Sequence, residues 1–103
     1  MKNLTQEEWK KGISNDENIE ILDVRTPDEF NEGYIPGAQN IDIYKGQGFI
    51  EEVNELDKSK EYYVYCRSGA RSAQACTLME QQGFENTYNL QGGITEWNGE
   101  VTT

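Results

Sequence analysis

Short apolar runs alternate along the chain with segments of helical periodicity. The runs typical of strands cover residues 19–24, 38–41, 62–65 and 87–90. The clearest helical pattern covers residues 71–82, where Ala75, Leu78 and Met79 share one face and Gly83 follows as an end signal. Strands that alternate with helices predict an α/β fold, with a mainly parallel sheet covered on both faces.

Local capping signals mark two further helix starts. Residues 5–8 read Thr-Gln-Glu-Glu and residues 26–29 read Thr-Pro-Asp-Glu, and both fit a capping box. In the second of these segments, proline occupies the first helical position. Shorter helices are expected at residues 51–56 and after Gly92-Gly93, and Arg25 is expected to pair with Glu29 across its turn. The pattern accounts for residues 1–103 as one domain.

The charge balance narrows the range of partners. The chain has 19 Asp and Glu against 9 Lys and Arg, a formal net charge of -10. Nucleic acids and anionic membranes would be repelled, so neither is expected as a general partner. No segment approaches the roughly 18 apolar residues that a membrane span needs. The N-terminus has no apolar stretch of signal-peptide type, so a cytoplasmic protein is expected.

Two cysteines and no histidine exclude several kinds of site. A Ser-His-Asp triad, a Cys-His dyad and a histidine-containing zinc site all need histidine, and a cysteine-rich zinc site needs more cysteines. We therefore expect no metal. A Cys66–Cys76 disulfide is not expected in a reducing cytosol, and Cys76 is predicted to be a small packed residue of its helix.

The strongest chemical signal is a loop between a strand and a helix. Its residues are Cys66, Arg67, Ser68, Gly69, Ala70, Arg71 and Ser72. Cys66 follows the strand directly, at the sheet edge where α/β proteins bind ligands. The small residues allow backbone N–H groups to converge on one point, and two of the three arginines of the chain flank it. Helix starts favour acidic residues, so arginines here predict that an anion occupies the turn and that Cys66 is a thiolate.

This loop resembles the active-site loop of the rhodanese family, small sulfurtransferases with a Cys-x4-Arg pattern. Three other segments resemble the N-terminal signature of that family: Leu-Asp-Val-Arg at 22–25, Asp-Glu-Phe at 28–30 and Gly-Tyr-Ile-Pro-Gly-Ala at 33–38. Gly92-Gly93-Ile94 with Trp97 resembles its C-terminal element. The resemblance covers nearly the whole chain in the correct order, and it implies a five-stranded, mostly parallel sheet flanked by helices on both faces.

The resemblance also implies a mechanism. Thiosulfate, or a similar small sulfur-containing anion, would dock on Arg67 and Arg71, and Cys66 would take its outer sulfur as a persulfide. The loop from Arg67 to Ser72 would bind the substrate, and its N–H groups would stabilise the persulfide. Cyanide or a thiol would then accept the sulfur, and the donor or acceptor could also be a protein persulfide. Neither a metal nor an organic cofactor is implied.

Two alternatives remain open at this stage. One is a non-catalytic persulfide carrier or partner-docking module of the same family. The other is a cysteine-dependent phosphatase or arsenate reductase, which resembles this loop but has Cys-x5-Arg. Four residues separate Cys66 from Arg71, and this smaller ring favours a single sulfur atom over a tetrahedral oxyanion.

Overall fold

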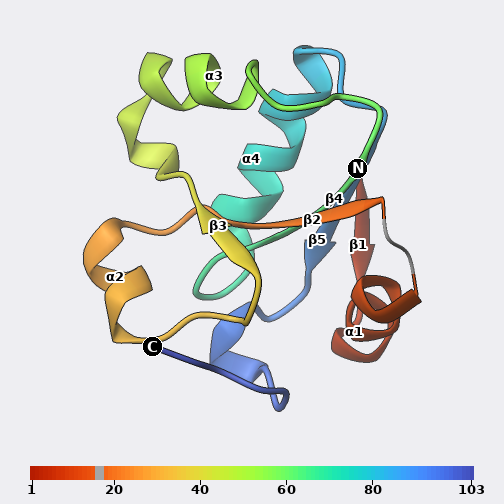
Figure 1. The fold of residues 1–103 in the computed structure, drawn as a ribbon, viewed down its shortest axis with the longest axis vertical. Coiled ribbons are helices and arrows are strands. Elements are labelled where there is room, and N and C mark those ends of the chain that lie inside the picture. Colours follow the sequence, from red (N-terminus) through yellow and green to blue (C-terminus); the bar gives the residue numbers. More distant parts are fainter. Residues whose placement is uncertain (16–17) are drawn as a thin grey trace.

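A computed structural model describes residues 1–15 and 18–103. Within this part of the chain, five strands form one parallel sheet in the order β1-β5-β4-β2-β3 (Figure 1). The strands are β1 Lys2–Leu4, β2 Ile19–Asp23, β3 Ala38–Asn40, β4 Glu61–Tyr65 and β5 Asn86–Leu90. The predicted α/β architecture with a five-stranded parallel sheet is therefore confirmed.

The helices connect these strands. They are α1 Gln6–Asn15, α2 Pro27–Glu32, α3 Gln47–Val53 and α4 Ala70–Gln81, with 3-10 turns η1 Ile43–Lys45 and η2 Ile94–Glu96. Both predicted capping boxes are present: Glu8 N–H donates to Thr5 Oγ1 while Thr5 N–H donates to Glu8 Oε1, and Thr26 and Glu29 do the same at α2. Both helix starts form locally, because the N-cap threonine and the glutamate that completes the box are three residues apart in the sequence.

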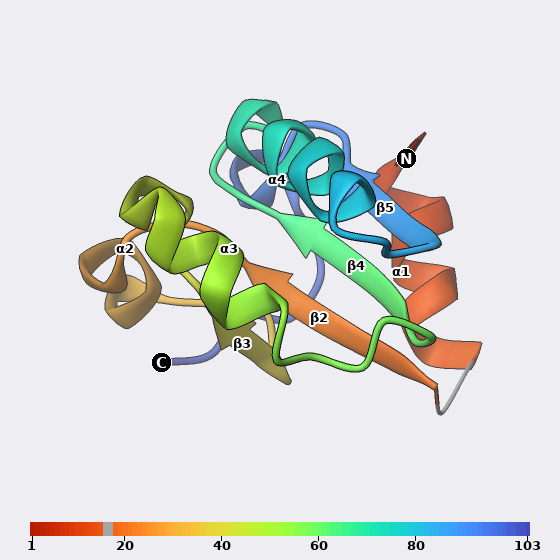
Figure 2. The ribbon, with the colours of Figure 1, turned by 90° about the horizontal axis from the view of Figure 1, so that it is seen from above.

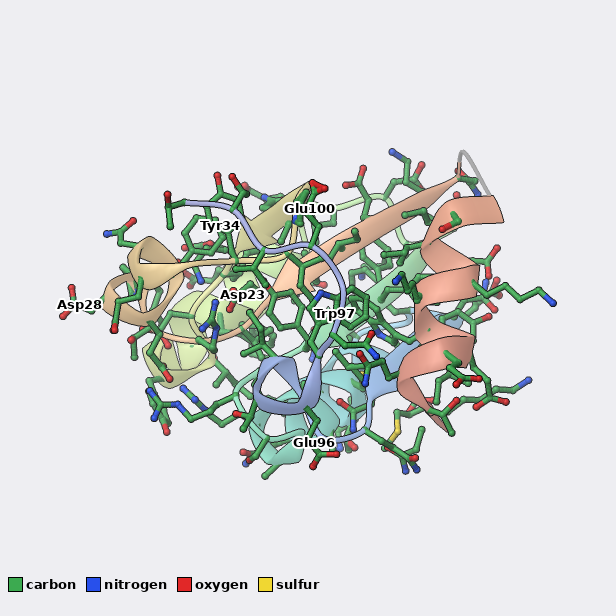
Figure 3. The ribbon with its side chains drawn as sticks, turned by 90° about the horizontal axis from the view of Figure 1, so that it is seen from below. Asp23, Asp28, Tyr34, Glu96, Trp97 and Glu100 are labelled. Atoms are coloured by element: carbon green, nitrogen blue, oxygen red, sulfur yellow. The ribbon has the colours of Figure 1, made fainter. Side chains whose placement is uncertain are left out.

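Alternating side chains of the strands build a core on each face of the sheet. In β4, Tyr62 and Val64 face the cluster that contains Phe49 of α3 and Met79 of α4. Tyr63 and Tyr65 face the opposite cluster, which is centred on the fully buried Trp9 of α1. Figure 2 shows α3 and α4 on one side of the sheet and α1 on the other. On the side of α1, the segment after η2 crosses the molecule and carries Trp97 (Figure 3).

Two elements differ from the sequence prediction. Helix α3 covers residues 47–53 rather than 51–56, because Gly46 at φ +59° begins it and the apolar pair Phe49 and Val53 packs into the core. Strand β1 was not among the four predicted strands. Its three residues pair with β5 at the sheet edge, and this contact spans almost the whole chain.

The parallel arrangement brings three connections to one edge of the sheet. The chain leaves β2 toward α2, leaves β4 at Cys66 toward α4, and leaves β5 toward Gly92-Gly93 and η2. The loop singled out from sequence therefore meets two segments that are remote from it along the chain. Of the helices in the described ranges, none has the length and apolarity needed to cross a membrane.

Candidate active site

The loop after β4 curls around the sulfur of Cys66. Gly69 takes the left-handed conformation at φ +105° as the N-cap of α4, and its N–H donates to Cys66 Sγ at 3.0 Å. A Cβ at this position would lie 3.3 Å from the carbonyl oxygen of Leu90. The positive φ favours glycine and the close approach leaves little room for a side chain, so the predicted role of a small residue here has a specific backbone cause.

The Cys66 thiol is buried, with only 1% of the residue exposed. Burial by itself would raise its pKa. Hydrogen bonds from the Ser72 hydroxyl and from the backbone N–H groups of Ser72, Gly69 and Ser68 outweigh this effect, so the pKa of Cys66 lies below its ordinary value. These donors, rather than the two arginines, are the main source of the lowering, which refines the expectation from sequence. Arg71 adds a direct electrostatic interaction with Cys66.

A polar network behind the sulfur was not predicted from sequence. The buried Ser72 hydroxyl lies 3.4 Å from Cys66 Sγ and also hydrogen bonds with Asn89 Oδ1 of β5. The amide of Asn89 donates to the Gly69 carbonyl at 3.2 Å and to Asn3 Oδ1 at 2.9 Å. Asn89 thus ties β1, β5 and the loop together. A polar residue among the apolar positions at the end of a buried strand is the signal that could have identified it.

The segment after β5 packs directly on the loop backbone. Ile94 N–H donates to the Cys66 carbonyl at 3.0 Å, while the backbone N–H and the hydroxyl of Thr95 donate to the Arg67 carbonyl at 3.1 and 2.7 Å. Gly93 has φ +61°, and a Cβ there would lie 2.3 Å from the Arg67 carbonyl oxygen. Gly93, the second glycine of the pair noted in the sequence, therefore contacts the backbone of the loop directly.

An anion does occupy the turn at the start of α4, and it belongs to the protein. Glu29 of α2 forms a bidentate ion pair with Arg71, at 2.8 and 2.9 Å, and accepts a hydrogen bond from Arg67 Nε at 3.1 Å. The Arg71 hydrogen bonds hold the pKa of Glu29 far below its ordinary value. The predicted Arg25–Glu29 pair is wrong, because Glu29 faces α4 and caps α2 with the same carboxylate.

Arg25 instead forms a buried pair with Asp23 at the end of β2. Its guanidinium nitrogens lie 2.6 to 3.1 Å from the Asp23 carboxylate oxygens, and Nη2 also donates to the Gly33 carbonyl at 2.7 Å. Asn40 of β3 donates to the carbonyls of both residues. This network fixes the connection between β2 and α2, the helix that carries Glu29.

The second cysteine lies away from this chemistry. Cys76 is fully buried on α4, and burial raises its pKa to about 12. Both cysteines are free thiols. Cys76 is therefore a packed residue of the core, as its place in the helix predicted. Over the described residues, no group of three or more His, Cys, Asp or Glu side chains is placed to hold a metal ion.

The profile of the rhodanese-like domain matches residues 5–100 of the chain. The chain belongs to the rhodanese family. It is similar to the putative sulfurtransferase YtwF of Bacillus subtilis, with 41% identity over 102 residues that cover 98% of this chain and 94% of that protein. It is also similar to a sulfurtransferase of Allochromatium vinosum, with 35% identity over 91% of this chain and 85% of that one.

Solved structures agree with this assignment. A rhodanese-like domain protein from Staphylococcus aureus superposes with a TM-score of 0.82 at 33% identity, and the match covers 97% of this chain and 94% of that one. Another relative, the putative sulfur carrier protein YrkF of Bacillus subtilis, is 36% identical over 95% of this chain, which corresponds to 51% of YrkF. Both enzymes and a carrier are thus named among the relatives of this rhodanese domain.

Proposed function

We propose that this rhodanese domain is a sulfurtransferase that moves sulfane sulfur through a persulfide on Cys66. The observation that carries the proposal is the set of donors directed at Cys66 Sγ: a hydroxyl and several backbone N–H groups at the start of a helix. Such donors stabilise a thiolate, and they would stabilise the anionic outer sulfur of a persulfide in the same way.

The first half of the reaction loads the cysteine. The Cys66 thiolate attacks the outer sulfur of thiosulfate and forms a new S–S bond, while the S–S bond of thiosulfate breaks and its electron pair leaves with sulfite. The products are an anionic Cys66 persulfide and sulfite. Arg67 is the cation available for docking, since its side chain is 64% exposed, whereas Arg71 is 18% exposed.

The second half restores the thiolate. Cyanide or a thiolate acceptor attacks the terminal sulfur, the persulfide S–S bond breaks, and its electron pair returns to Cys66. Ser72 and the loop N–H groups stabilise the negative charge on sulfur throughout, so the chain itself supplies the nucleophile and the electrostatic stabilisation. The scheme uses no metal and no organic cofactor. A reducing cytoplasm would keep Cys66 and Cys76 as thiols.

The alternative within the family is a persulfide carrier that loads once and passes its sulfur to a protein partner. A relative of this chain is named a putative sulfur carrier protein, which supports this alternative. Carrier and enzyme share the loading step and differ in the acceptor. For a carrier, the acceptor is a specific protein, whereas an enzyme also uses cyanide or a small thiol.

Steady-state kinetics separate the two. An enzyme forms many equivalents of thiocyanate from thiosulfate and cyanide, whereas a carrier takes up about one sulfur atom per Cys66 and forms little thiocyanate. The Cys66→Ser variant is the control, and it should produce nothing above background. Efficient hydrolysis of p-nitrophenyl phosphate by the unmodified protein would instead support a phosphatase and contradict the sulfurtransferase proposal.

A further inference from the structure

Glu29 is a fixed negative charge inside the anion site. Oε1 accepts from the Thr26 N–H at 3.1 Å, from the Thr26 hydroxyl at 3.2 Å and from Arg71 at 2.8 Å. Oε2 accepts from Arg71 at 2.9 Å and from Arg67 at 3.1 Å. Only 13% of the side chain is exposed. Because five donors hold the carboxylate and two of them belong to the cap of α2, an incoming anion cannot displace it without opening the helix start.

The charge at the loop is therefore smaller than the two arginines suggest. Arg67 and Arg71 contribute two positive charges and Glu29 removes one, since all three groups are in contact. Arg71 donates from both terminal nitrogens to Glu29 and packs over the Tyr44 ring, with its guanidinium carbon 5.4 Å from the ring centroid. Arg67 is left as the exposed member.

On the basis of the proposed sulfur transfer, we propose that Glu29 is a specificity-determining residue for the sulfur donor. Its charge makes the site prefer a monoanion, such as a thiosulfonate or an organic persulfide, over a dianion such as thiosulfate. The two arginines and Glu29 together carry about one positive charge, and this charge also faces the Cys66 thiolate, so little of it is left to balance a second negative charge on the donor. A second negative charge on the donor remains unbalanced beside the Glu29 carboxylate. Glu29 contacts neither Cys66 nor its sulfur in this structure, so it acts through the arginines as a positioning residue.

The test compares two donors, thiosulfate as the dianion and methanethiosulfonate as the monoanion, in the full chain. The measured quantity is selectivity, the ratio of kcat/KM for the dianion to kcat/KM for the monoanion. A variant that merely disturbs the loop changes both values together and leaves this ratio unchanged. Glu29→Gln keeps an acceptor for Thr26 and Arg71 and removes the charge, so the ratio should rise by about tenfold.

Asp28→Asn is the matched control. It removes the same charge from the neighbouring residue of α2, whose side chain is exposed and projects away from the body of the protein (Figure 3). Its selectivity should stay within about twofold of the wild type, because a surface charge without a partner is screened. If Asp28→Asn raises the ratio as much as Glu29→Gln, net charge rather than Glu29 sets the preference, and the proposal is overturned.

Two further variants test the charge balance itself. Arg67→Gln leaves Arg71 and Glu29, a neutral pair, so selectivity should fall by about tenfold. The double variant Glu29→Gln/Arg67→Gln restores the local charge of the wild type, and its ratio should return to near the wild-type value. Arg67→Gln alters an exposed side chain, so a ratio that does not fall in this variant shows that charge at the loop does not set the preference, and it overturns the proposal even if Glu29→Gln fails to fold.

The outcomes separate this proposal from the one on which it rests. If both donors load Cys66 but the ratio does not respond to these variants, Glu29 does not set donor charge and the sulfurtransferase proposal stands. If neither donor transfers sulfur to Cys66 in the wild type, both proposals are wrong.

Discussion

At the scale of single residues, the chemistry of Cys66 depends on which groups donate to its sulfur. The Gly69 N–H and the Ser72 hydroxyl donate to Sγ, and Asn89 Oδ1 is a second acceptor of the Ser72 hydroxyl. Burial works against the thiolate, so these donors decide the balance. The arginines are engaged with Glu29 and contribute less to the lowered pKa of Cys66 than these donors do.

Replacing Ser72 with alanine should raise the pKa of Cys66, because the thiolate loses a hydroxyl donor in a buried site. The active thiolate then forms only at higher pH, so the rising limb of kcat/KM against pH should move to higher pH. Absorbance of the thiolate at different pH values measures the same shift directly. Cys76 does not interfere, because burial raises its pKa to about 12.

Ser68→Ala is the matched control for this titration. The Ser68 N–H contributes to the lowered pKa of Cys66, and the substitution keeps that N–H while removing an exposed hydroxyl. The titration should stay unchanged in Ser68→Ala. An unchanged titration in Ser72→Ala would show that the hydroxyl does not stabilise the thiolate.

At the scale of elements, the site is assembled from the ends of three parallel strands. The segment after β5 supplies Ile94 and Thr95, which donate hydrogen bonds to the backbone carbonyls of Cys66 and Arg67. Helix α2, which follows β2, supplies Glu29. The loop after β4 is thus fixed on two sides by segments that only the fold brings close, and its geometry depends on their contact.

Gly93→Ala tests that dependence. A Cβ there would lie 2.3 Å from the Arg67 carbonyl oxygen and 2.7 Å from the Cys66 carbonyl oxygen, so the loop must move. We expect sulfur transfer to fall by about a hundredfold, because a displacement near 1 Å is enough to lose that much. Steady-state thiocyanate formation measures the loss.

Gly46→Ala is the control for the backbone conformation. Gly46 has φ +59°, close to the φ of Gly93, and a Cβ at Gly46 would meet nothing within 4 Å. Both variants carry the strain of a positive φ, and only Gly93→Ala pushes on the loop. Equal losses of activity in the two folded variants would show that strain, rather than contact with the loop, is responsible.

At the scale of the whole molecule, the sheet separates two cores, and the aromatic core on the side of α1 supports the segment that holds the loop. Trp9 is fully buried and makes edge contacts with Tyr63, Tyr65 and Trp97, at centroid distances of 5.7, 6.0 and 5.5 Å. Trp97 lies directly after η2. Stability of the fold and position of the loop are therefore linked through one side chain.

Trp9→Ala should lower the free energy of unfolding by about 3–5 kcal/mol, through lost burial and the cavity left behind. Urea unfolding followed by circular dichroism measures this change. Tyr44→Ala, at an aromatic residue that is 68% exposed, should cost less than about 1 kcal/mol, since it loses only a surface contact with Arg71. If the two variants lost similar amounts of unfolding free energy, Trp9 would not be the main contributor to the stability of this core.

The sequence was sufficient where structure depends on near neighbours. The capping boxes at Thr5 and Thr26 and the helix after Cys66 follow from residues a few positions apart. The sequence was insufficient where the residues in contact are far apart along the chain. Glu29 and Arg71 are 42 positions apart, and Asn89 and Ser72 are 17 apart, so neither contact has a local signal. The short strand β1 is stabilised only by pairing with β5.

The most direct test of the central claim is the intact mass of the protein after exposure to thiosulfate, with peptide mapping of the product. Wild type and Cys76→Ser should each gain one sulfur atom on the peptide that contains Cys66, and cyanide should remove it. Cys66→Ser should gain none. A sulfur adduct that persists in Cys66→Ser, or that maps to Cys76, would contradict the assignment of Cys66 as the residue that carries sulfur.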